Sequence, residues 1–403
     1  MDRENDVIIV GGGAAGLVAA VKAAERRRKV LLIEKSDRPG RKILASGNGR
    51  CNMMNSGSLR YFGDREFAYK VIEKCSQYDI ASFFHQYGLY TAEESEGRIY
   101  PLTYQSASVV SVLRNALKLT GAHILINNAV TSAVNHHEGF TVTTASGKKY
   151  LSDKLIIACG GAAQPRLGGT EDGYRFLSDM GHHLIPVHPS LVPLTTDNKS
   201  ISGLSGIRIR CGVSVKSNGK TIHQEAGEVL FTDYGISGIC IMQCARYIES
   251  TGCLIELNLL QNAFKNRLQA SEEMRRRKEQ FPDADPQWLL NGILPEKLSY
   301  AVLKQSGIKL QGETISDIDK SAINLIVQTA SAYRIKVTGN RGIENAQVTA
   351  GGIDCRDFDP ETMSSYLVRG LYAAGEVLNV DGDCGGYNLM FAFASGLIAG
   401  SDV

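Results

Sequence analysis

The chain begins with two short, uninterrupted apolar runs that flank an alanine-rich segment. The runs are residues 7–10 and 30–33, and the segment between them covers residues 14–25. Short runs without polar alternation are typical of parallel strands that are buried on both faces. The pattern therefore predicts a strand, a helix and a second strand. The apolar face of the predicted helix consists of Leu17, Ala20, Val21 and Ala24.

Apolar runs farther along the chain predict more strands and a closing helix. Residues 123–126, 155–159 and 371–374 are each typical of a buried strand. The sequence GGYNLMFAFASG, residues 385–396, leads from two glycines directly into an apolar helix. The glycines keep side chains away from the start of this helix. These elements predict an α/β fold with a Rossmann-like sheet.

The middle of the chain follows a different pattern. Residues 207–215 and 227–232 are strand-like runs separated by turns, whereas residues 263–281 are helical. A second helical stretch begins at Pro286, with Asp285 as its expected N-cap. Because 403 residues exceed the size of a usual single core, we expect more than one folding unit.

Composition and charge are those of an ordinary globular protein. Hydrophobic residues make up 43% and charged residues 21%, and the formal net charge is +2. This balance favours neither nucleic acid nor a membrane as partner, although it leaves room for a local basic face. No secretory leader or membrane-length apolar run is found, and nine irregularly spaced cysteines favour reduced thiols. We therefore expect a cytoplasmic protein, with Cys240 and Cys244 buried in a structural role and no indication of the oligomeric state.

The strongest chemical signal follows the first predicted strand. Gly11, Gly13 and Gly16 have the G-x-G-x-x-G spacing, in which the glycines allow a tight turn, approach of a pyrophosphate and close helix packing. The helix start offers unpaired N–H groups to that pyrophosphate. Glu34 ends the second strand, 23 positions after Gly11, where a carboxylate accepts from both ribose hydroxyls and disfavours a 2′-phosphate. The sequence therefore predicts a dinucleotide site.

Three neighbouring segments favour an extended dinucleotide over a simple NAD site. The loop at residues 35–52 is polar, basic and rich in glycine, so its backbone could wrap a cofactor; a solvated surface loop is the alternative. Ala129 and Val130 follow a strand whose end could contact an adenine through its backbone. The strand at 155–159 runs into Gly160 and should lie beside the first strand. Residues 160–173 are glycine-rich but lack the fingerprint spacing, so a nicotinamide donor would dock only transiently.

Two other clusters carry weaker signals. The basic and acidic residues at 265–267 and 272–279 favour a solvated helix face with i,i+4 pairs, and a phosphate-contacting face for RNA is the alternative. His182, His183 and His188 suggest a metal site, but no cysteine or carboxylate supports it at ligand spacing. We therefore predict no metal.

Several blocks along the whole chain together resemble one family of flavoproteins. The blocks are the glycine fingerprint with Glu34, GRK and SGNGRCN in the following loop, ACGG at 158–161, GEVLFTDYGISG at 227–238 and GLYAAGEVLNVDGDCGGYN at 370–388. They resemble the BaiN-like, or YhiN-like, bacterial NAD(P)/FAD-dependent oxidoreductases. The resemblance implies a glutathione-reductase-type, Rossmann-like FAD-binding domain that is formed by both ends of the chain, residues 1–189 and 345–403, and is split by an insertion. The inserted residues 190–344 would be a substrate-binding lid, with a small β-rich part at about 190–260 and a helical part at about 261–335.

The resemblance also implies where FAD binds. The last strand would end at the ribityl chain, and the helix start at Asn388, Leu389 and Met390 would face the N1–C2=O edge of the flavin, where its dipole stabilises the reduced anion by roughly 0.3–2 kcal/mol. The implied cofactor-binding residues are Gly11, Gly13, Ala14, Ala15, Gly16, Glu34, Lys35, Arg41, Lys42, Gly49, Arg50, Cys51, Asn52, Val130, Gly160, Gly375, Glu376, Asp381, Gly386, Tyr387, Asn388 and Leu389.

The reaction that the resemblance implies is reduction of a C=C bond conjugated to a carbonyl, because characterised members act on 3-oxo-Δ4,6 bile acids or on uridine in ribosomal RNA. NADH or NADPH would reduce FAD, and flavin N5 would pass hydride to the β carbon. The candidate proton donors are Cys51, Cys384 and Tyr387. Candidate walls of a pocket for a small conjugated ketone are Phe231, Tyr234, Ile236, Ile239 and Met242.

Three alternatives remain open. Uridine in ribosomal RNA could be the substrate, although a small molecule is favoured. The chain could be an O2-using amine oxidase of the aminoacetone type, or a non-catalytic FAD-binding regulator. Neither the proton donor nor the choice between NADH and NADPH follows from the sequence.

Overall fold

The computed structural model describes residues 5–248, 252–309 and 312–403. The chain divides into two compact units. Unit 1 contains the chain up to Pro189 and from Ala346 to the end, and unit 2 is Ser190–Asn345.

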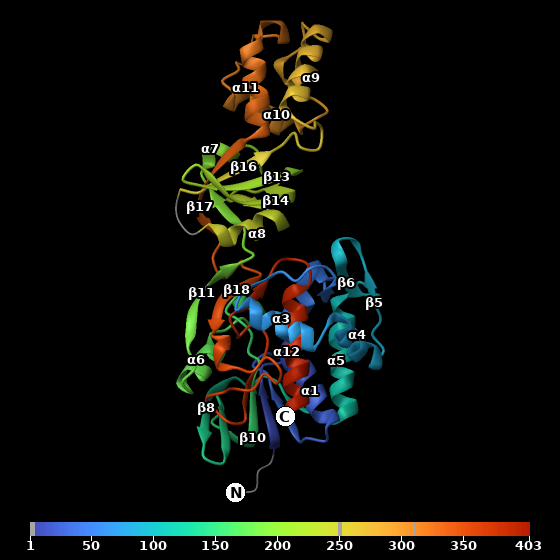
Figure 1. The fold of residues 1–403 in the computed structure, drawn as a ribbon, viewed down its shortest axis with the longest axis vertical. Coiled ribbons are helices and arrows are strands. Elements are labelled where there is room, and N and C mark those ends of the chain that lie inside the picture. The colour runs from blue at the N-terminus through green and yellow to red at the C-terminus, as the bar shows by residue number, and fades with distance from the viewer. Residues whose placement is uncertain (1–4, 249–251, 310–311) are drawn as a thin grey trace. The chain divides into compact units, whose positions relative to one another are not determined.

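A mixed sheet forms the centre of unit 1 (Figure 1), and its strand order is β7-β2-β1-β10-β9-β8, with β19 also paired to β10. β1, β2, β7, β10 and β19 run parallel, because β1 pairs with β2 and β10, β2 with β7, and β10 with β19. β9 and β8 form an antiparallel hairpin against the first half of β10. The bounds are β1 Asn5–Val10, β2 Val30–Ile33, β7 His123–Leu125, β8 Val130–His136, β9 Gly139–Thr144, β10 Lys149–Ile157 and β19 Leu371–Ala373.

The central strands are buried as their apolar runs predict. Every residue of β2 and β19 is buried, as are the last four of β1. The predicted strand at 155–159 is the second half of β10, which lies beside β1 as expected. This confirms the Rossmann-like α/β fold that the hydrophobic pattern predicts.

Helices and small sheets surround this centre. The long helices α1, α5 and α12 pack together, and α12 also contacts α3 and α4. β3, β5 and β6 form one small sheet, β4 pairs with β20, and β11 pairs with β18. The helices are α1 Ala14–Glu25, α2 Arg41–Ala45, α3 Arg65–Lys74, α4 Gln77–Gln86, α5 Ser106–Thr120, α6 Asp172–Asp179 and α12 Tyr387–Asp402. The strands are β3 Met54–Asn55, β4 Tyr61–Gly63, β5 Thr91–Glu93, β6 Arg98–Pro101, β11 Leu184–Ser190, β18 Val348–Ile353 and β20 Val380–Gly382.

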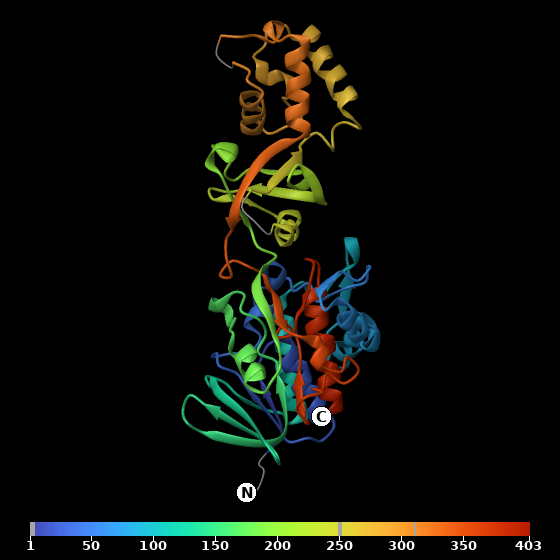
Figure 2. The ribbon, with the colours of Figure 1, turned by 60° about the vertical axis from the view of Figure 1, so that its left-hand side comes forward.

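Unit 2 consists of a closed barrel and a group of helices (Figure 2). Strands β12-β15-β14-β13-β16-β17 close the barrel, and the chain passes from β16 through α9, α10 and α11 to β17. The strands are β12 Leu194–Thr196, β13 Arg208–Ser217, β14 Lys220–Phe231, β15 Gly235–Ser237, β16 Leu254–Asn258 and β17 Tyr333–Asn340. The helices are α7 Asn198–Ile201, α8 Ile239–Cys244, α9 Arg267–Gln280, α10 Glu296–Gln305 and α11 Lys320–Ser331.

Two predicted helix starts were wrong. The helix expected from residue 263 begins at Arg267, because Asn266 accepts the backbone N–H of Gln269 at 3.0 Å and so caps it. Asp285 makes no side-chain cap, and Pro286–Leu289 form only a 3-10 turn.

The segment 35–52 is also more regular than a loop. It contains α2, which is followed by a 3-10 turn at Ser46–Gly49. Cys240 and Cys244, which the sequence places in a structural role, are both buried within α8.

Candidate functional site

The glycine fingerprint forms a turn that only glycine can complete. Gly11 has a φ of +107°, and a Cβ atom added there would lie 2.4 Å from the carbonyl oxygen of Ala158. A Cβ added at Gly16 would lie 1.9 Å from the carbonyl oxygen of Gly11, so α1 packs directly onto the turn. By contrast, nothing lies within 4 Å of a Cβ added at Gly13, which precedes α1. No side chain caps α1, so its first N–H groups are available to a ligand.

Glu34 is held at the end of β2 by backbone groups. Its Oε2 accepts the N–H of Gly12 at 2.7 Å, and its Oε1 accepts the N–H of Ser36 at 2.7 Å. Each carboxylate oxygen has a second lone pair, so Glu34 can still accept from a ligand. The turn before β8 lies here too, because the N–H of Asn128 donates to the carbonyl of Glu34 at 3.0 Å. Val130, which begins β8, and the half-exposed Lys35 therefore lie near Glu34.

An ion pair connects the segment after β2 with the end of β19. Lys42 Nζ lies 2.9 Å from Glu376 Oε2, and the N–H of Thr349 donates to Glu376 Oε1 at 2.9 Å. A Cβ added at Gly160 would meet only Lys42 Nζ, at 3.9 Å. Four segments that are distant in sequence therefore converge beside the carboxyl ends of β10 and β19. Thr349 was missed by sequence reasoning, since only its position in an apolar run distinguishes it there.

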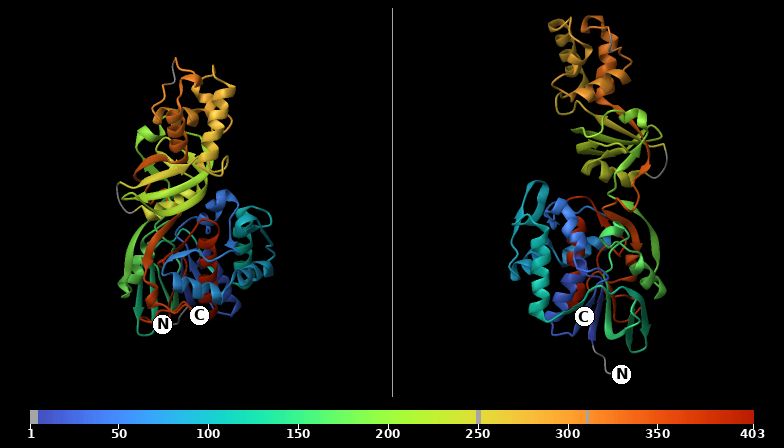
Figure 3. Two further views of the ribbon diagram at one scale, coloured as in Figure 1. Left: turned by 45° about the horizontal axis from the view of Figure 1, so that its top comes forward. Right: turned by 180° about the vertical axis from the view of Figure 1, so that it is seen from behind.

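The two ends of the chain meet where α1 packs against α12 (Figure 3). Added Cβ atoms at Gly396 and Gly400 would lie 2.3 and 2.5 Å from the carbonyl oxygens of Ala15 and Ala19. Since both pairs advance by four residues, the helices run in the same direction. At a rise of about 1.5 Å per residue, α12 extends about 12 Å beyond the start of α1. Gly375 completes this contact, because its added Cβ would lie 3.0 Å from that of Ala15.

The start of α12 is uncapped and closely surrounded. Gly386 precedes it with a φ of +105°, and a Cβ there would lie 2.3 Å from the carbonyl oxygen of Met54. The side chain of Asn388 is used within its own loop, since it accepts the N–H of Gly382 and donates to the carbonyl of Gly382, both at 2.8 Å. The backbone N–H groups of the first turn, including that of Leu389, therefore have no side-chain cap.

Asn52 offers a further acceptor beside this helix start. Its Oδ1 atom is buried and has no hydrogen-bond partner among the described residues. A Cβ added at Gly386 would lie 2.8 Å from this oxygen. A buried amide oxygen without a partner is costly, so the observation indicates a donor that a bound ligand provides.

The loop that leads to Asn52 has an unusual backbone and occupied side chains. Gly49 and Cys51 both have positive φ, at +82° and +57°. Arg50 pairs with Glu94 at 2.7 Å, and its guanidinium also lies over the rings of Tyr100 and Tyr104. Arg41 donates to the carbonyl of Arg166 at 2.8 Å. Both arginine side chains therefore have partners within the protein.

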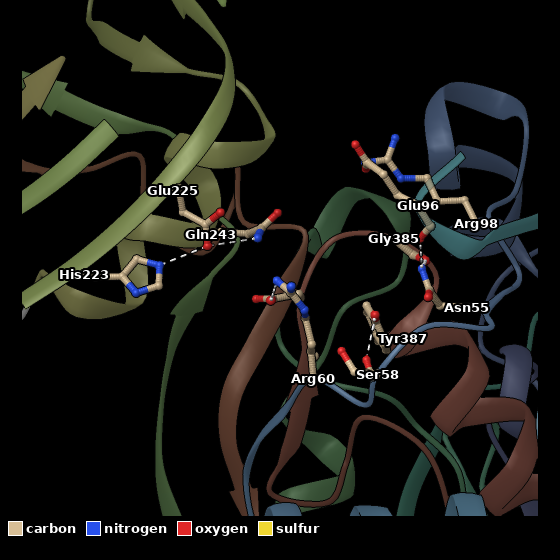
Figure 4. A network of polar contacts seen from close by, with 12 residues as sticks. Asn55, Ser58, Arg60, Glu96, Arg98, His223, Glu225, Gln243, Gly385 and Tyr387 are labelled. Atoms are coloured by element: carbon tan, nitrogen blue, oxygen red, sulfur yellow. Dashed lines mark hydrogen bonds and ion pairs between the residues drawn. The ribbon is translucent and has the colours of Figure 1, made fainter. Parts of the chain in front are cut away.

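The three candidate proton donors differ in their surroundings. Tyr387 donates its hydroxyl hydrogen to the carbonyl of Ser58 at 2.9 Å (Figure 4). Cys384 lies 3.7 Å from Gln347 Oε1, and burial raises the pKa of its thiol to about 12. Cys51 is fully buried, and burial raises the pKa of its thiol to about 11. Asp381, an expected cofactor contact, is buried in β20.

Polar side chains that sequence reasoning missed hold the corner before α12 (Figure 4). Asn55 is buried and donates to the carbonyl of Gly385 at 2.8 Å and to that of Glu96 at 3.1 Å. Arg98 pairs with Glu96, and its Nε would lie 4.0 Å from a Cβ at Gly385. Only tertiary contacts bring these residues to the helix start, so no local motif reveals them.

The residues proposed as pocket walls in unit 2 divide into two groups. Phe231 and Ile236 pair across β14 and β15 and are fully buried in the barrel, so they do not wall an open pocket. Ile239 is 43% exposed, and Tyr234 is covered by the guanidinium of Arg341 at 4.4 Å from its ring. Met242 lies on α8 and is half-buried.

The basic residues of α9 are largely used inside unit 2. Arg276 and Arg277 both pair with Glu273, at 2.8 and 2.9 Å. Arg277 also donates to the carbonyl of Asn291 at 2.7 Å, and Lys278 to that of Ser316 at 3.0 Å. This arrangement favours the structural interpretation of the cluster.

His182 has two partners of its own. One ring nitrogen lies 3.0 Å from the carbonyl of Leu177 and the other 2.7 Å from the hydroxyl of Ser365. Neither nitrogen is then open to a metal. Among the described residues, no three His, Cys, Asp or Glu side chains gather in a way that could hold a metal ion. Across the same residues, no helix combines the length and apolar character needed to span a bilayer.

Comparison with known proteins identifies relatives over nearly the full length. The chain is 34% identical over 379 residues to the 3-dehydro-bile acid delta(4,6)-reductase of Clostridium scindens. This match covers 92% of this chain and 91% of the relative. It is 31% identical over 374 residues to the ribosomal RNA dihydrouridine synthase of Haemophilus influenzae, and this match covers 91% of this chain and 90% of the relative.

A solved structure with a similar fold is the 3-ketosteroid-delta4-(5alpha)-dehydrogenase of Rhodococcus jostii RHA1. The match has a TM-score of 0.50 and 14% identity, and covers 100% of this chain and 97% of that one, which shows a shared fold. A family model described as the HI0933-like protein Rossmann domain matches residues 5–402. The chain therefore belongs to the HI0933-like family, and its resemblance to BaiN-like and YhiN-like proteins is confirmed.

Proposed function

We propose that the protein is an FAD-dependent oxidoreductase that reduces a C=C bond conjugated to a carbonyl group. The observation that carries the proposal is the arrangement of two uncapped helix starts on parallel, packed helices, with Glu34 and Glu376 beside the start of α1 and Asn52 beside the start of α12. The two starts are offset by about 12 Å along α12. An extended dinucleotide suits this arrangement better than a compact ligand does.

The residues present fit FAD at both ends. The N–H groups at Gly13 and the start of α1 suit a pyrophosphate, and Glu34 has lone pairs left for ribose hydroxyls. The unpartnered Asn52 Oδ1 suits a ring N–H donor, and the uncapped start of α12 suits a ring edge that gains negative charge. When bound, FAD supplies transfer of a hydride equivalent to the substrate.

The other residues of the site hold the groups that would contact the cofactor in place, or are candidates to supply a proton. Lys42 and the N–H of Thr349 fix Glu376 from two sides, so its carboxylate can accept from a polyol hydroxyl without turning away. Asn55 holds the carbonyl of Gly385, which keeps the corner before α12 in place. Cys384 and Tyr387 lie at this corner and are the proposed sources of the proton for the α carbon, whereas full burial disfavours Cys51.

The substrate class comes from the names of the relatives. A delta(4,6)-reductase and a dihydrouridine synthase both, by name, act on a C=C bond, and in each ring that bond is conjugated to a carbonyl. A 3-oxo-Δ4 or Δ4,6 steroid or bile acid is the first candidate, because the relative with that activity is 34% identical. NADH or NADPH is the proposed reductant, and it would dock transiently, since the sequence carries only one full glycine fingerprint.

Uridine in ribosomal RNA is the second candidate. The observation in its favour is 31% identity to a ribosomal RNA dihydrouridine synthase over 91% of this chain. The pairing of Arg276, Arg277 and Lys278 inside unit 2 does not favour a phosphate-binding face on α9.

Anaerobic stopped-flow absorbance at the flavin band tests the proposal. Protein loaded with FAD is reduced by NADH or NADPH and then mixed with a 3-oxo-Δ4 steroid, uridine-containing ribosomal RNA or O2. We expect the steroid to reoxidise the flavin fastest, and free FAD at equal concentration is the control. Fastest reoxidation by RNA would select the second candidate. Rapid reoxidation by O2 with peroxide release would contradict an ene-reductase and favour an amine oxidase.

Two further outcomes concern the reductant and the proton. If the protein binds FAD but no electron donor bleaches the flavin, the result would contradict an enzymatic role and favour a non-catalytic FAD-binding regulator. In the same assay, Cys384→Ala and Tyr387→Phe are compared with Cys75→Ala, a buried cysteine at the C-terminal end of α3. We expect one of the first two variants to slow reoxidation by about 100-fold while reduction is unchanged.

A further inference from the structure

Arg98 is held at the corner before α12 with part of its guanidinium unused. It begins β6, and its Nη2 donates to the carboxylate of Glu96, two residues earlier. Among the described residues, Nε and Nη1 of Arg98 have no hydrogen-bond partner. A guanidinium carries five N–H donors in one plane, so a single carboxylate leaves several of them for a ligand. Arg98 therefore keeps donors that the described protein groups do not use.

The side chain of Arg98 lies against the protein and does not extend into water. It is 27% exposed, whereas Arg60, which pairs with Asp383 at 3.5 Å, is 54% exposed. A Cβ added at Gly385 would lie 4.0 Å from Nε of Arg98, so this nitrogen lies over the backbone of the corner (Figure 4). An ion pair that serves only the surface leaves both partners in water and contributes little. The limited exposure of Arg98 therefore indicates a positioned group.

The segment that carries Glu96 has a strained backbone. The φ of Glu96 is +62°, in the left-handed region that a glutamate rarely adopts. The buried Asn55 donates to the carbonyl of Glu96 at 3.1 Å and to that of Gly385 at 2.8 Å, so one amide group fixes both segments. Residues in this region persist only where their surroundings hold them, and they gather at ligand sites. Glu96 and Arg98 are therefore fixed in relation to the start of α12.

Arg98 also lies beside a candidate proton source. Cys384 directly precedes Gly385, and burial raises the pKa of its thiol to about 12. The charge of Arg98 opposes this rise, so the guanidinium is within electrostatic reach of the thiol. In a conjugated ketone the α carbon is bonded to the carbonyl carbon. A donor to the carbonyl oxygen and a proton source for the α carbon must then lie side by side, as Arg98 and Cys384 do.

We propose that Arg98, oriented by Glu96, binds the carbonyl oxygen of the conjugated substrate and stabilises the negative charge that develops on it. The inference rests on the proposed function, and both residues belong to unit 1. When the β carbon gains a hydride equivalent, the electron pair of the C=C bond moves towards this oxygen, and a proton added to the α carbon then restores the carbonyl. Arg98 keeps its own proton, because a guanidinium is not deprotonated in proteins. Arg98 is thus assigned as a catalytic residue and Glu96 as a positioning residue.

Four variants of the FAD-loaded, full-length protein test this assignment: Arg98→Met, Arg98→Lys, Glu96→Gln and the control Arg65→Met. Arg65 is an exposed arginine of the same unit that begins α3 and pairs with Glu66 at 3.4 Å. Each variant is reduced with stoichiometric dithionite and mixed anaerobically with 4-androstene-3,17-dione or with uridine, since a 3-oxo steroid and a uracil ring share the conjugated carbonyl. Thermal melting and flavin content establish that each variant is folded and loaded.

We expect Arg98→Met to weaken binding of the effective ligand to oxidised protein about tenfold and to slow flavin reoxidation about 100-fold. Arg98→Lys keeps the charge without the planar fork, so it should recover part of both losses. Glu96→Gln should slow reoxidation less than Arg98→Met does, and the double variant should be no slower than Arg98→Met alone. Arg65→Met should stay within about twofold of wild type throughout. The steroid and uridine arms show which source of the carbonyl is used.

The midpoint potential of the bound flavin separates this role from two others. Because Arg98 is assigned to the substrate, Arg98→Met should leave both the potential and the dissociation constant of FAD unchanged. A lower potential would show that the guanidinium stabilises the reduced flavin, and it would overturn the assignment. Wild-type ligand binding and reoxidation in Arg98→Met would show a purely structural role and overturn it as well.

A phenolate provides a readout that needs no turnover. p-Nitrophenolate carries negative charge on an oxygen attached to a ring, and its binding to oxidised protein is followed through the flavin absorbance. We expect its dissociation constant to rise about tenfold in Arg98→Met. If neither the steroid nor uridine reoxidises wild type, the proposed function fails, and p-nitrophenolate still decides whether Arg98 holds an oxyanion. In that case equal binding by both proteins, or none by wild type, overturns the inference.

Discussion

At the scale of single residues, Glu34 has the most sharply defined geometry. Its two oxygens accept the N–H groups of Gly12 and Ser36, both at 2.7 Å. Glu34→Gln turns one acceptor into an NH2 group that faces an N–H donor, and it removes the charge that ribose hydroxyls would meet. We expect the dissociation constant of FAD to rise about 10- to 100-fold, measured by fluorescence titration of the apoprotein.

A nearby acid provides the control for Glu34. Asp37 lies three residues later and is exposed, so Asp37→Asn should leave FAD affinity within about twofold. Wild-type affinity in Glu34→Gln would show that this carboxylate does not contact the cofactor.

His182 makes a residue-scale prediction about pH. Burial lowers the pKa of His182 from its usual 6.5, because the charged ring is poorly solvated beside Phe358. The folded state therefore prefers the neutral ring, and the stability that His182 contributes is fully present above pH 6.5. It is lost as the pH falls below 6.5 towards the lower folded-state pKa.

Urea unfolding between pH 8 and pH 5 measures this effect. At pH 8 we expect His182→Gln to be about 1–2 kcal/mol less stable than wild type, because both ring nitrogens lose their partners. The difference should shrink as the pH falls through 6.5. His137→Gln, in the exposed hairpin of β8 and β9, is the control. A difference that stays constant with pH would contradict the assignment.

At the scale of elements, the packing of α12 on α1 sets the distance between their starts. Gly396 has no room for a methyl group, since its Cβ would lie 2.3 Å from the carbonyl oxygen of Ala15. Gly396→Ala must push the helices apart, so we expect a loss of about 1–3 kcal/mol in the free energy of unfolding of the apoprotein. The same shift would move the start of α12 and accelerate FAD release during gel filtration.

The matched control lies on the same helix. Ser401→Ala removes only the hydrogen bond from its hydroxyl to the carbonyl of Leu397, at 2.8 Å. It should retain FAD as wild type does. If Gly396→Ala also retains FAD with an unchanged release rate, the register of these helices does not determine cofactor binding.

At the scale of the whole molecule, the division into two units predicts two unfolding events. Unit 1 and unit 2 each have their own buried centre, the mixed sheet in one and the barrel in the other. Since the proposed FAD residues all belong to unit 1, FAD should stabilise only one of two calorimetric transitions. At a free concentration of 100 Kd, the stabilisation is about 2.7 kcal/mol.

The two transitions can be assigned with the variants described above. Gly396→Ala should lower the transition that FAD raises, and a barrel variant such as Val229→Ala should lower the other. A single transition that FAD raises as a whole would contradict independent unfolding of the units.

The local sequence pattern was sufficient to predict those parts of the structure that are formed by residues close in sequence. The apolar runs of β1 and β2, the glycines between them and Glu34 predict the first part of the site, because a strand, a tight turn and a helix depend on residues close in sequence. Helix starts were less predictable. Asn266, rather than a residue near 263, caps α9, because several polar side chains compete for that role and packing decides between them.

The sequence by itself determined the fold class, the glycine turn and the identity of its carboxylate, since these follow from spacing along one short segment. Only the tertiary structure decided that Thr349 and Lys42 hold Glu376, that Arg50 is bound by Glu94 and two tyrosines, and that Asn52 has an oxygen without a partner. It alone brings Arg98 beside Gly385. The physical reason is that hydrogen bonds and ring contacts between distant segments depend on how the chain packs. The spacing of residues within one short segment does not predict that packing.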